Sequence, residues 1–277
     1  ESDVSGESST VSEPVSATEI TTEEKQQQTE FTKSESTLAS LFLWWYTGNE
    51  MKVLAVLSKV LYSHHCDHQN QYNSSILQIK NVLDRATIER AWRSRWFAKG
   101  NLTGTVDALM KEEYESLLLN ESFIDKWTNV SEEKLDSLPM WLLISLLILF
   151  DQVPRNVFRG TPKSFAYDHI GILFAERLLK RWHSGEIDLP FGFQLTVLIG
   201  MCHAENGEKQ KNLLNVMKTN KSFLSYKKDH EVVFVGIHDI VKNHLERIEL
   251  FGRFPERNNI LERESTDEEI AFLKALG

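Results

Sequence analysis

Cysteine is nearly absent from this sequence, which has only Cys66 and Cys202 among 277 residues. Two cysteines cannot form the disulfide framework of a small secreted domain, and their scarcity favours a reducing compartment or a matrix space. We therefore expect an intracellular protein. It would be cytoplasmic, or mitochondrial if Glu1 is a processed N-terminus of a matrix protein.

Proline and glycine are also scarce, with six prolines and thirteen glycines in the whole chain. After residue 37 the apolar residues recur at helical spacing, and alternating strand-like runs are few. A hydrophobic content of 41% is enough to build a sizeable core. The sequence therefore predicts an all-α fold with a single helical domain over residues 37–277.

No apolar run is long enough to predict a transmembrane segment. The longest strongly apolar run, Met140 to Phe150, is about half of the roughly 20 residues that a helix needs to cross a bilayer. We expect this run to be a buried core helix.

Basic residues are fewer than acidic residues, and the formal net charge is −9. Residues 1–36 hold nine acidic residues and two lysines, which leaves 29 basic and 31 acidic residues, a net charge of −2, from residue 37 onward. A near-neutral body argues against a broad nucleic-acid-binding surface. The Ser-, Thr- and Glu-rich tail should be disordered in isolation or extended along a partner protein.

Familiar catalytic signatures are missing as well. We find no nucleophile elbow, phosphate-binding glycine loop, paired-histidine zinc motif or nucleotide fingerprint. The contiguous residues His64 to His68 favour a polar loop over a metal site, because adjacent side chains point in different directions. We expect no cofactor and no metal.

The most informative stretch that is present is residues 139–160, PMWLLISLLILFDQVPRNVFRG. An apolar helix is predicted to begin after Pro139 and to run into a dense polar turn that contains Pro154. This turn carries the polar residues Asp151, Gln152, Arg155, Asn156 and Arg159. Polar groups that leave a buried helix must find partners, because an unpaired buried group costs about 1–3 kcal/mol.

A similar pattern returns about a hundred residues later. Residues 251–258, FGRFPERN, again follow an apolar helix and again place Arg-Asn after a proline. We expect the two motifs to lie in one helical bundle. Beyond them, Ser265 to Glu269 contain overlapping capping boxes that predict a short terminal helix.

Three segments together resemble a known family. LFDQVPRNVFRGTPKSFAYD, MCHAENGEKQ and HLERIELFGRFPERNNILERESTDEEIAFL are similar to the domain-of-unknown-function family numbered 924. The resemblance covers roughly residues 92–277, is strongest over 139–277, and leaves 37–91 as divergent N-terminal helices. It implies a tetratricopeptide-like bundle of antiparallel helices, and it implies no reaction. The motif positions carried over are Asp151, Gln152, Pro154, Arg155, Asn156, Arg159, Gly160, Asp168, His203, Glu205, Gln210, His244, Gly252, Arg253, Pro255, Arg257 and Asn258.

Two interpretations of these polar residues stay open at this point. Under the first, they pair with one another and hold the bundle together. Under the second, a pocket for a small anion is formed by Arg155, Arg159, Arg253 and Arg257, with Asn156 and Asn258. Acid–base or metal-binding groups are then supplied by Asp151, His203, Glu205 and His244.

We expect a non-catalytic helical interaction or scaffold protein, an accessory subunit of a larger assembly that contacts other proteins through its helical surface and its tail. The alternative is a small-anion-binding protein or enzyme that uses the arginine pocket.

Overall fold

The computed structural model describes Leu41 and residues 101–276. The predicted tail at 1–36, the histidine-rich segment and nearly all of the predicted helices at 37–91 lie outside the described residues. Within residues 101–276 every regular element is helical, which confirms the predicted all-α class. The finer prediction of tetratricopeptide-like packing stays a prediction.

The described helices follow one another with short connections. In chain order they are α5 (Asn101–Leu118), α6 (Glu121–Thr128), α7 (Glu132–Ser137), α8 (Met140–Val157), the 3-10 helix η3 (Pro162–Phe165), α9 (Asp168–His183), α10 (Phe191–Cys202), α11 (Gly207–Thr219), α12 (Lys221–Ser225), α13 (Glu231–Phe251), the 3-10 helix η4 (Pro255–Arg257) and α14 (Asp267–Leu276).

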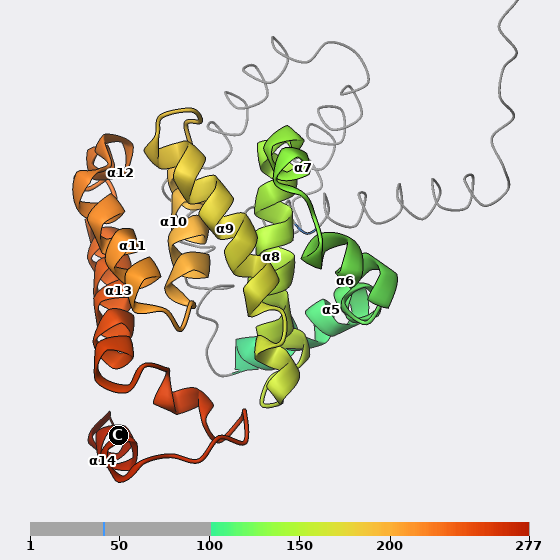
Figure 1. Ribbon diagram of the computed structural model, residues 1–277, viewed down its shortest axis with the longest axis vertical. Coiled ribbons are helices and arrows are strands. Elements are labelled where there is room, and N and C mark those ends of the chain that lie inside the picture. The colour runs from blue at the N-terminus through green and yellow to red at the C-terminus, as the bar shows by residue number, and fades with distance from the viewer. Residues whose placement is uncertain (1–40, 42–100, 277) are drawn as a thin grey trace, which may run out of the picture. The chain divides into compact units, whose positions relative to one another are not determined.

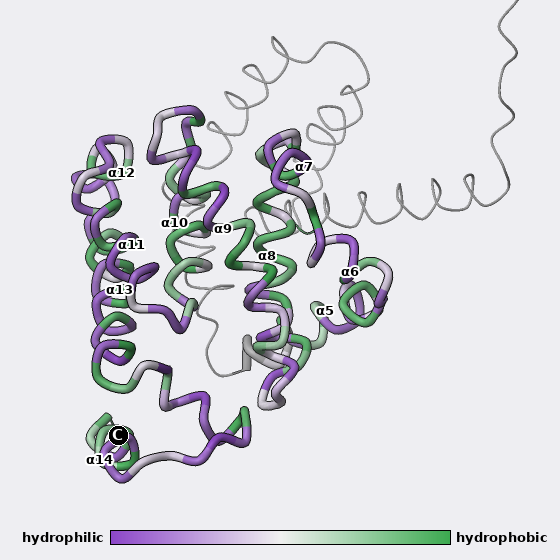
Figure 2. The backbone as a smooth tube through the Cα atoms, viewed as in Figure 1, coloured by the Kyte–Doolittle hydropathy of each residue, from purple (hydrophilic) through white to green (hydrophobic). Residues whose placement is uncertain are grey.

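Helix α8 is the centre of the packing. It contacts α5, α9 and α10, and Figure 1 shows it between α5 and α9. All eight residues from Leu143 to Phe150 are fully buried, and the hydropathy colouring of Figure 2 shows α8 and α10 as largely apolar. Burial of one large aliphatic or aromatic side chain contributes about 1.5–3 kcal/mol, so this helix supplies much of the core.

The polar residues after Phe150 are in the helix and not in a turn, which corrects the sequence-based boundary. Helix α8 continues to Val157 with Pro154 inside its last turns. Proline lacks the N–H that would bond to the Phe150 carbonyl oxygen, so the helix continues past Pro154 with one backbone hydrogen bond missing. The extended helix is long and apolar enough to span a bilayer, but 89% of it is buried inside the fold.

A glycine brings α9 close to α8 beside Asp151. A Cβ atom on Gly171 would lie 3.3 Å from the backbone nitrogen and from Cβ of Asp151. Glycine is unfavourable inside a helix by about 1 kcal/mol relative to alanine, so its use here fits the need for close approach. Asp168, one turn earlier in α9, is thereby brought near the buried end of α8.

The chain reverses after α13, which packs against α10 and α11. Gly252 ends α13 in the left-handed conformation, with φ +71°. The predicted terminal capping box is confirmed: the Thr266 amide donates to Glu269 Oε2 at 2.9 Å, and the Glu269 amide donates to Thr266 Oγ1 at 3.2 Å. Residues 252–276, which we call the C-terminal segment, return Arg257 to α9 and α10.

Candidate functional site

A carboxylate is buried near the end of the core helix. Only 4% of the Asp151 side chain is exposed. Its Oδ1 lies 2.6 Å from Nδ1 of His203, which follows α10, and 3.3 Å from the Arg155 guanidinium, while Gln152 donates to Oδ2. Because an ionised carboxylate can only accept hydrogen bonds, Nδ1 of His203 carries the proton. The buried charge of Asp151 is therefore fully paired.

Both members of this pair are held in definite protonation states. Burial alone would raise the pKa of Asp151, but His203 and Arg155 lower it below the usual range. Burial and Arg155 lower the pKa of His203, although Asp151 opposes them. At neutral pH the pair is thus a carboxylate beside a neutral imidazole. Nε2 of His203 is then an acceptor, and it makes no hydrogen bond to any residue that the structure describes.

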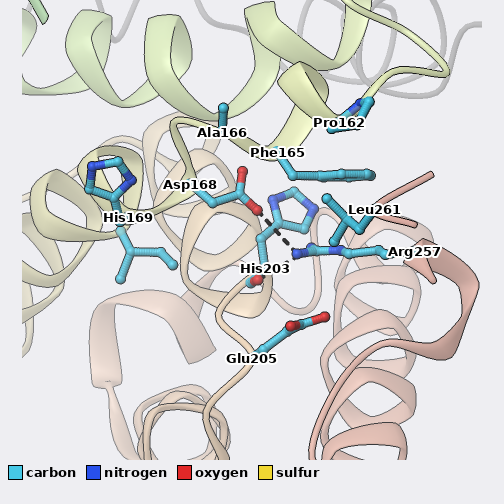
Figure 3. A pocket seen from close by; sticks show the side chains of 10 residues that line it. Pro162, Phe165, Ala166, Asp168, His169, His203, Glu205, Arg257 and Leu261 are labelled. Carbon is cyan, nitrogen blue, oxygen red and sulfur yellow. Dashed lines mark hydrogen bonds and ion pairs between the residues drawn. The ribbon is translucent and has the colours of Figure 1, made fainter. Parts of the chain in front are cut away.

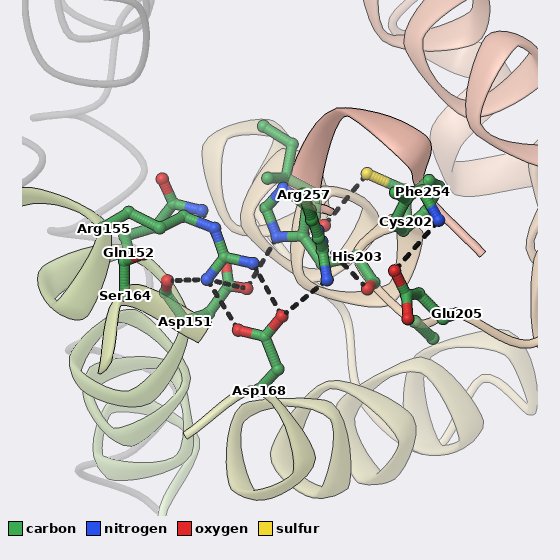
Figure 4. A network of polar contacts seen from close by, with 12 residues as sticks. Asp151, Gln152, Arg155, Ser164, Asp168, Cys202, His203, Glu205, Phe254 and Arg257 are labelled. Atoms are coloured by element: carbon green, nitrogen blue, oxygen red, sulfur yellow. Dashed lines mark hydrogen bonds and ion pairs between the residues drawn. The ribbon is translucent and has the colours of Figure 1, made fainter. Parts of the chain in front are cut away.

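Arg155 and Arg257, one from each of the two similar motifs, meet at Asp168, as Figure 4 shows. Arg155 donates to both Asp168 oxygens, at 2.8 and 3.0 Å, and Arg257 donates to Oδ2 at 3.1 Å. This bidentate geometry is the strong form of a guanidinium–carboxylate contact. The expectation that the two motifs lie in one bundle is confirmed.

Aromatic rings fix the plane of the Arg257 guanidinium. Its Cζ lies 4.7 Å from the ring centroid of Phe165 and 4.5 Å from that of Phe254. Cations are attracted to such ring faces, and a flat guanidinium also stacks on them. The side chain is therefore held in one orientation, with a further bond of 3.3 Å from its NH2 to the His203 carbonyl oxygen.

Glu205 attaches the C-terminal segment to the bundle. It accepts two bonds from Arg263, at 2.8 and 3.1 Å, and one from the Phe254 amide at 2.9 Å. Burial alone would raise its pKa, but Arg263 and the Phe254 amide lower it. Glu205 therefore stays ionised and serves as an anchor for residues 254 and 263.

His244 of α13, a predicted acid–base candidate, faces inward. Its ring centroid lies 4.9 Å from that of Phe254 and 6.1 Å from that of His203. Burial, with help from His203 and nearby arginines, lowers its pKa to about 3. His244 is therefore neutral over the physiological range, and its ring packs against Phe254 beside the site.

The other predicted binding residues lie away from this centre. Arg159 pairs with Asp107 at 2.6 and 2.8 Å, and Arg253 pairs with Glu269 at 2.7 and 2.8 Å. Asn156 donates to the Gln152 carbonyl oxygen. Asn258 donates to the side chains of Ser265 and Glu269. The structure thus does not gather the four arginines into one pocket, since each finds a carboxylate of its own or shares Asp168.

A pocket of about 310 Å³ opens beside the paired residues. Figure 3 shows the imidazole of His203 near the guanidinium of Arg257, with the Phe165 ring above them. The lining residues are Pro162, Phe165, Ala166, Asp168, His169, Ile172, His203, Glu205, Arg257 and Leu261. Of the four predicted arginines, only Arg257 lines this pocket. Of the predicted acid–base candidates, His203 and Glu205 do.

Sequence reasoning missed several members of the site. Asp168 was noted only as part of the family pattern, although it accepts bonds from two arginines, and Phe165, whose ring contacts Arg257, was not singled out. Arg263 was missed because its partner, Glu205, is 58 residues away in the sequence. Cys202 adjoins His203, but burial raises the pKa of its thiol far above the usual range, so it is no nucleophile at neutral pH.

Metal binding finds no support in residues 101–276. No group of three or more histidine, cysteine, aspartate or glutamate side chains that could hold an ion is present among the described residues. Asp151 and His203 form a pair only, and the arginines around them disfavour a cation.

Comparison with known proteins identifies a family and a solved structure that are similar to this chain. A family model described as "Bacterial protein of unknown function (DUF924)" matches residues 82–277, which confirms the resemblance. A solved structure of a protein of unknown function from Agrobacterium tumefaciens is similar at a TM-score of 0.50 and 24% identity, covering 69% of this chain and 96% of that chain. At this identity the similarity concerns the fold alone. No curated protein matches the chain.

The lowered histidine pKa values predict an acid-sensitive fold. His244 and His203 take up protons near pH 6.5 when unfolded but resist protonation when folded, so the free energy of unfolding falls as pH drops from 6.5 toward 3. The slope from His244 approaches about 1.4 kcal/mol per pH unit. Denaturant unfolding at pH 6.5, 5.75 and 5.0 measures this pH dependence of the unfolding free energy, and the slope should be smaller in His244→Gln. An unchanged slope in His244→Gln would contradict this assignment.

Proposed function

The chain belongs to the family of bacterial proteins of unknown function described above, and we propose that it binds a small molecule with His203 as the proton acceptor. The observation that carries the proposal is the polarised histidine. Nδ1 is bonded to buried Asp151 at 2.6 Å, while 15% of the His203 side chain is exposed and its ring lines a pocket.

The geometry suits a general base. A ligand hydroxyl, N–H or water that donates to Nε2 can pass its proton to the imidazole, and the resulting imidazolium keeps its Nδ1–H bond to Asp151. The carboxylate stabilises that cation and holds the ring in one tautomer and one orientation. The guanidinium of Arg257 lies near the imidazole in the same pocket, with N–H donors for an oxygen atom of the ligand.

The size of the pocket limits the ligand. Small-molecule pockets usually span about 300–1,000 Å³, so a pocket of about 310 Å³ accommodates only a compact molecule. Apolar side chains of Phe165, Ile172 and Leu261 form part of the wall. We therefore propose a compact ligand that has one apolar side and a few polar groups.

Filling the pocket should abolish binding without unfolding the protein. Ala166 is exposed at the pocket wall, so Ala166→Phe should remove binding of compact polar fragments detected by saturation-transfer NMR, while the unfolding free energy changes by about 0.5 kcal/mol or less. Ala275→Phe, at an exposed position of α14, is the matched control and should bind as wild type. Fragments that bind Ala166→Phe normally, or no fragment binding to wild type, would refute the proposal.

A second candidate function is a scaffold role as an accessory subunit that binds other proteins. It is favoured by two apolar side chains of α13 that face solvent, Val232 at 75% and Val235 at 49% exposure. Residues three apart lie on the same helix face, so the two valines present one apolar contact. A tetratricopeptide-like arrangement and the acidic tail at 1–36 would extend such a surface.

The scaffold role predicts separable losses of partner proteins. Val232→Asp with Val235→Asp, and independently deletion of residues 1–36, should each reduce the recovery of cross-linked partners measured by quantitative mass spectrometry. Asn243→Asp, which adds charge at an exposed position of the same helix, is the matched control. Recovery equal to wild type in both test variants would exclude both contacts.

A further inference from the structure

We propose that the pocket takes an uncharged ligand, one that donates a hydroxyl or amide hydrogen to Nε2 of His203 and accepts from Arg257, and not an anion. This inference rests on the proposed function, because it assigns a chemical class to the ligand of the same pocket. It replaces the small anion that the arginine-rich sequence motifs suggest.

The charges around the pocket balance. Three carboxylates, those of Asp151, Asp168 and Glu205, lie in or beside the pocket, and three guanidiniums pair with them. The guanidiniums belong to Arg155, Arg257 and Arg263. His203 is neutral, so the paired groups have no net charge. A charged ligand would lose hydration on entering without gaining an unpaired opposite charge, which makes such binding unfavourable.

The carboxylates of the pocket have little hydrogen-bonding capacity left. Asp168 already accepts three N–H bonds, two from Arg155 and one from Arg257. Glu205 likewise accepts three. An ionised carboxylate has about four acceptor sites, so little capacity is left on either residue. Nε2 of His203, which has no bond within the described part of the chain, is the acceptor that a ligand donor can use.

Arg257 provides the complementary donors. One of its N–H groups bonds to Asp168 and another to the His203 carbonyl oxygen, out of the five that a guanidinium carries. An anion strong enough to compete for the whole guanidinium would have to displace Asp168 and leave that carboxylate with Arg155 alone. A neutral carbonyl or hydroxyl oxygen can accept a remaining N–H without breaking either bond.

A set of nearly isosteric probes tests this inference on the full chain. Lactamide, lactate and 1-amino-2-propanol share a three-carbon skeleton and a hydroxyl group but are neutral, anionic and cationic at pH 7.5. Each is titrated while the 13C-labelled imidazole of His203, assigned by its loss in His203→Gln, is followed by NMR. Lactamide should shift the His203 signal in a saturable way, and lactate and the amine should bind at least about tenfold more weakly. Ala166→Phe should abolish the lactamide shift.

The outcomes separate the two proposals. If lactate or the amine shifts His203 at lower concentration than lactamide does, the ligand class is wrong and the pocket still binds small molecules. If lactamide produces no saturable shift, the ligand class is overturned, and the fragment measurements on wild type and Ala166→Phe decide independently whether the pocket binds anything. A lactamide shift that persists in Ala166→Phe places binding outside the pocket and overturns the inference.

Discussion

An ionised carboxylate buried beside the core helix is the constraint on which the rest of the site depends. Asp151 is buried in the last turns of α8, where an unpaired charge would cost several kcal/mol. Contacts with His203, which follows α10, and with Arg155, from the next turn of α8, offset that cost. Gly171 allows α9 to approach α8 closely beside Asp151. Of the groups in these contacts, His203 lines the pocket, as does Asp168 of α9.

Charge pairing also docks the C-terminal segment. Residues 252–276 are joined to the bundle by Arg257 to Asp168 and by Arg263 and the Phe254 amide to Glu205. Aromatic rings on both sides hold Arg257 in place. Internal pairing and a pocket therefore occur together in this structure. The pairing uses nearly all of the charge and leaves one polarised histidine facing the pocket.

The sequence predicts the features that depend on neighbouring residues. Helical periodicity gives the all-α class, and the capping box from Thr266 to Glu269 forms as expected. The end of α8 was predicted wrongly, because proline was taken as a boundary, whereas the helix continues to Val157 without the one backbone bond that Pro154 cannot make. Contacts between distant residues could not be predicted, since Arg159 and Asp107 are 52 residues apart and Arg257 and Asp168 are 89 residues apart.

The account requires that His203 be a neutral imidazole with its proton on Nδ1, held by Asp151, and with Nε2 unprotonated. The most direct test is a 15N NMR measurement of the His203 side chain at pH 7.5, which distinguishes protonated from unprotonated ring nitrogens. We predict a protonated Nδ1 and a bare Nε2, and the loss of this preference in Asp151→Asn. An imidazolium, or a proton on Nε2, would contradict the assignment of His203 as the proton acceptor of the pocket.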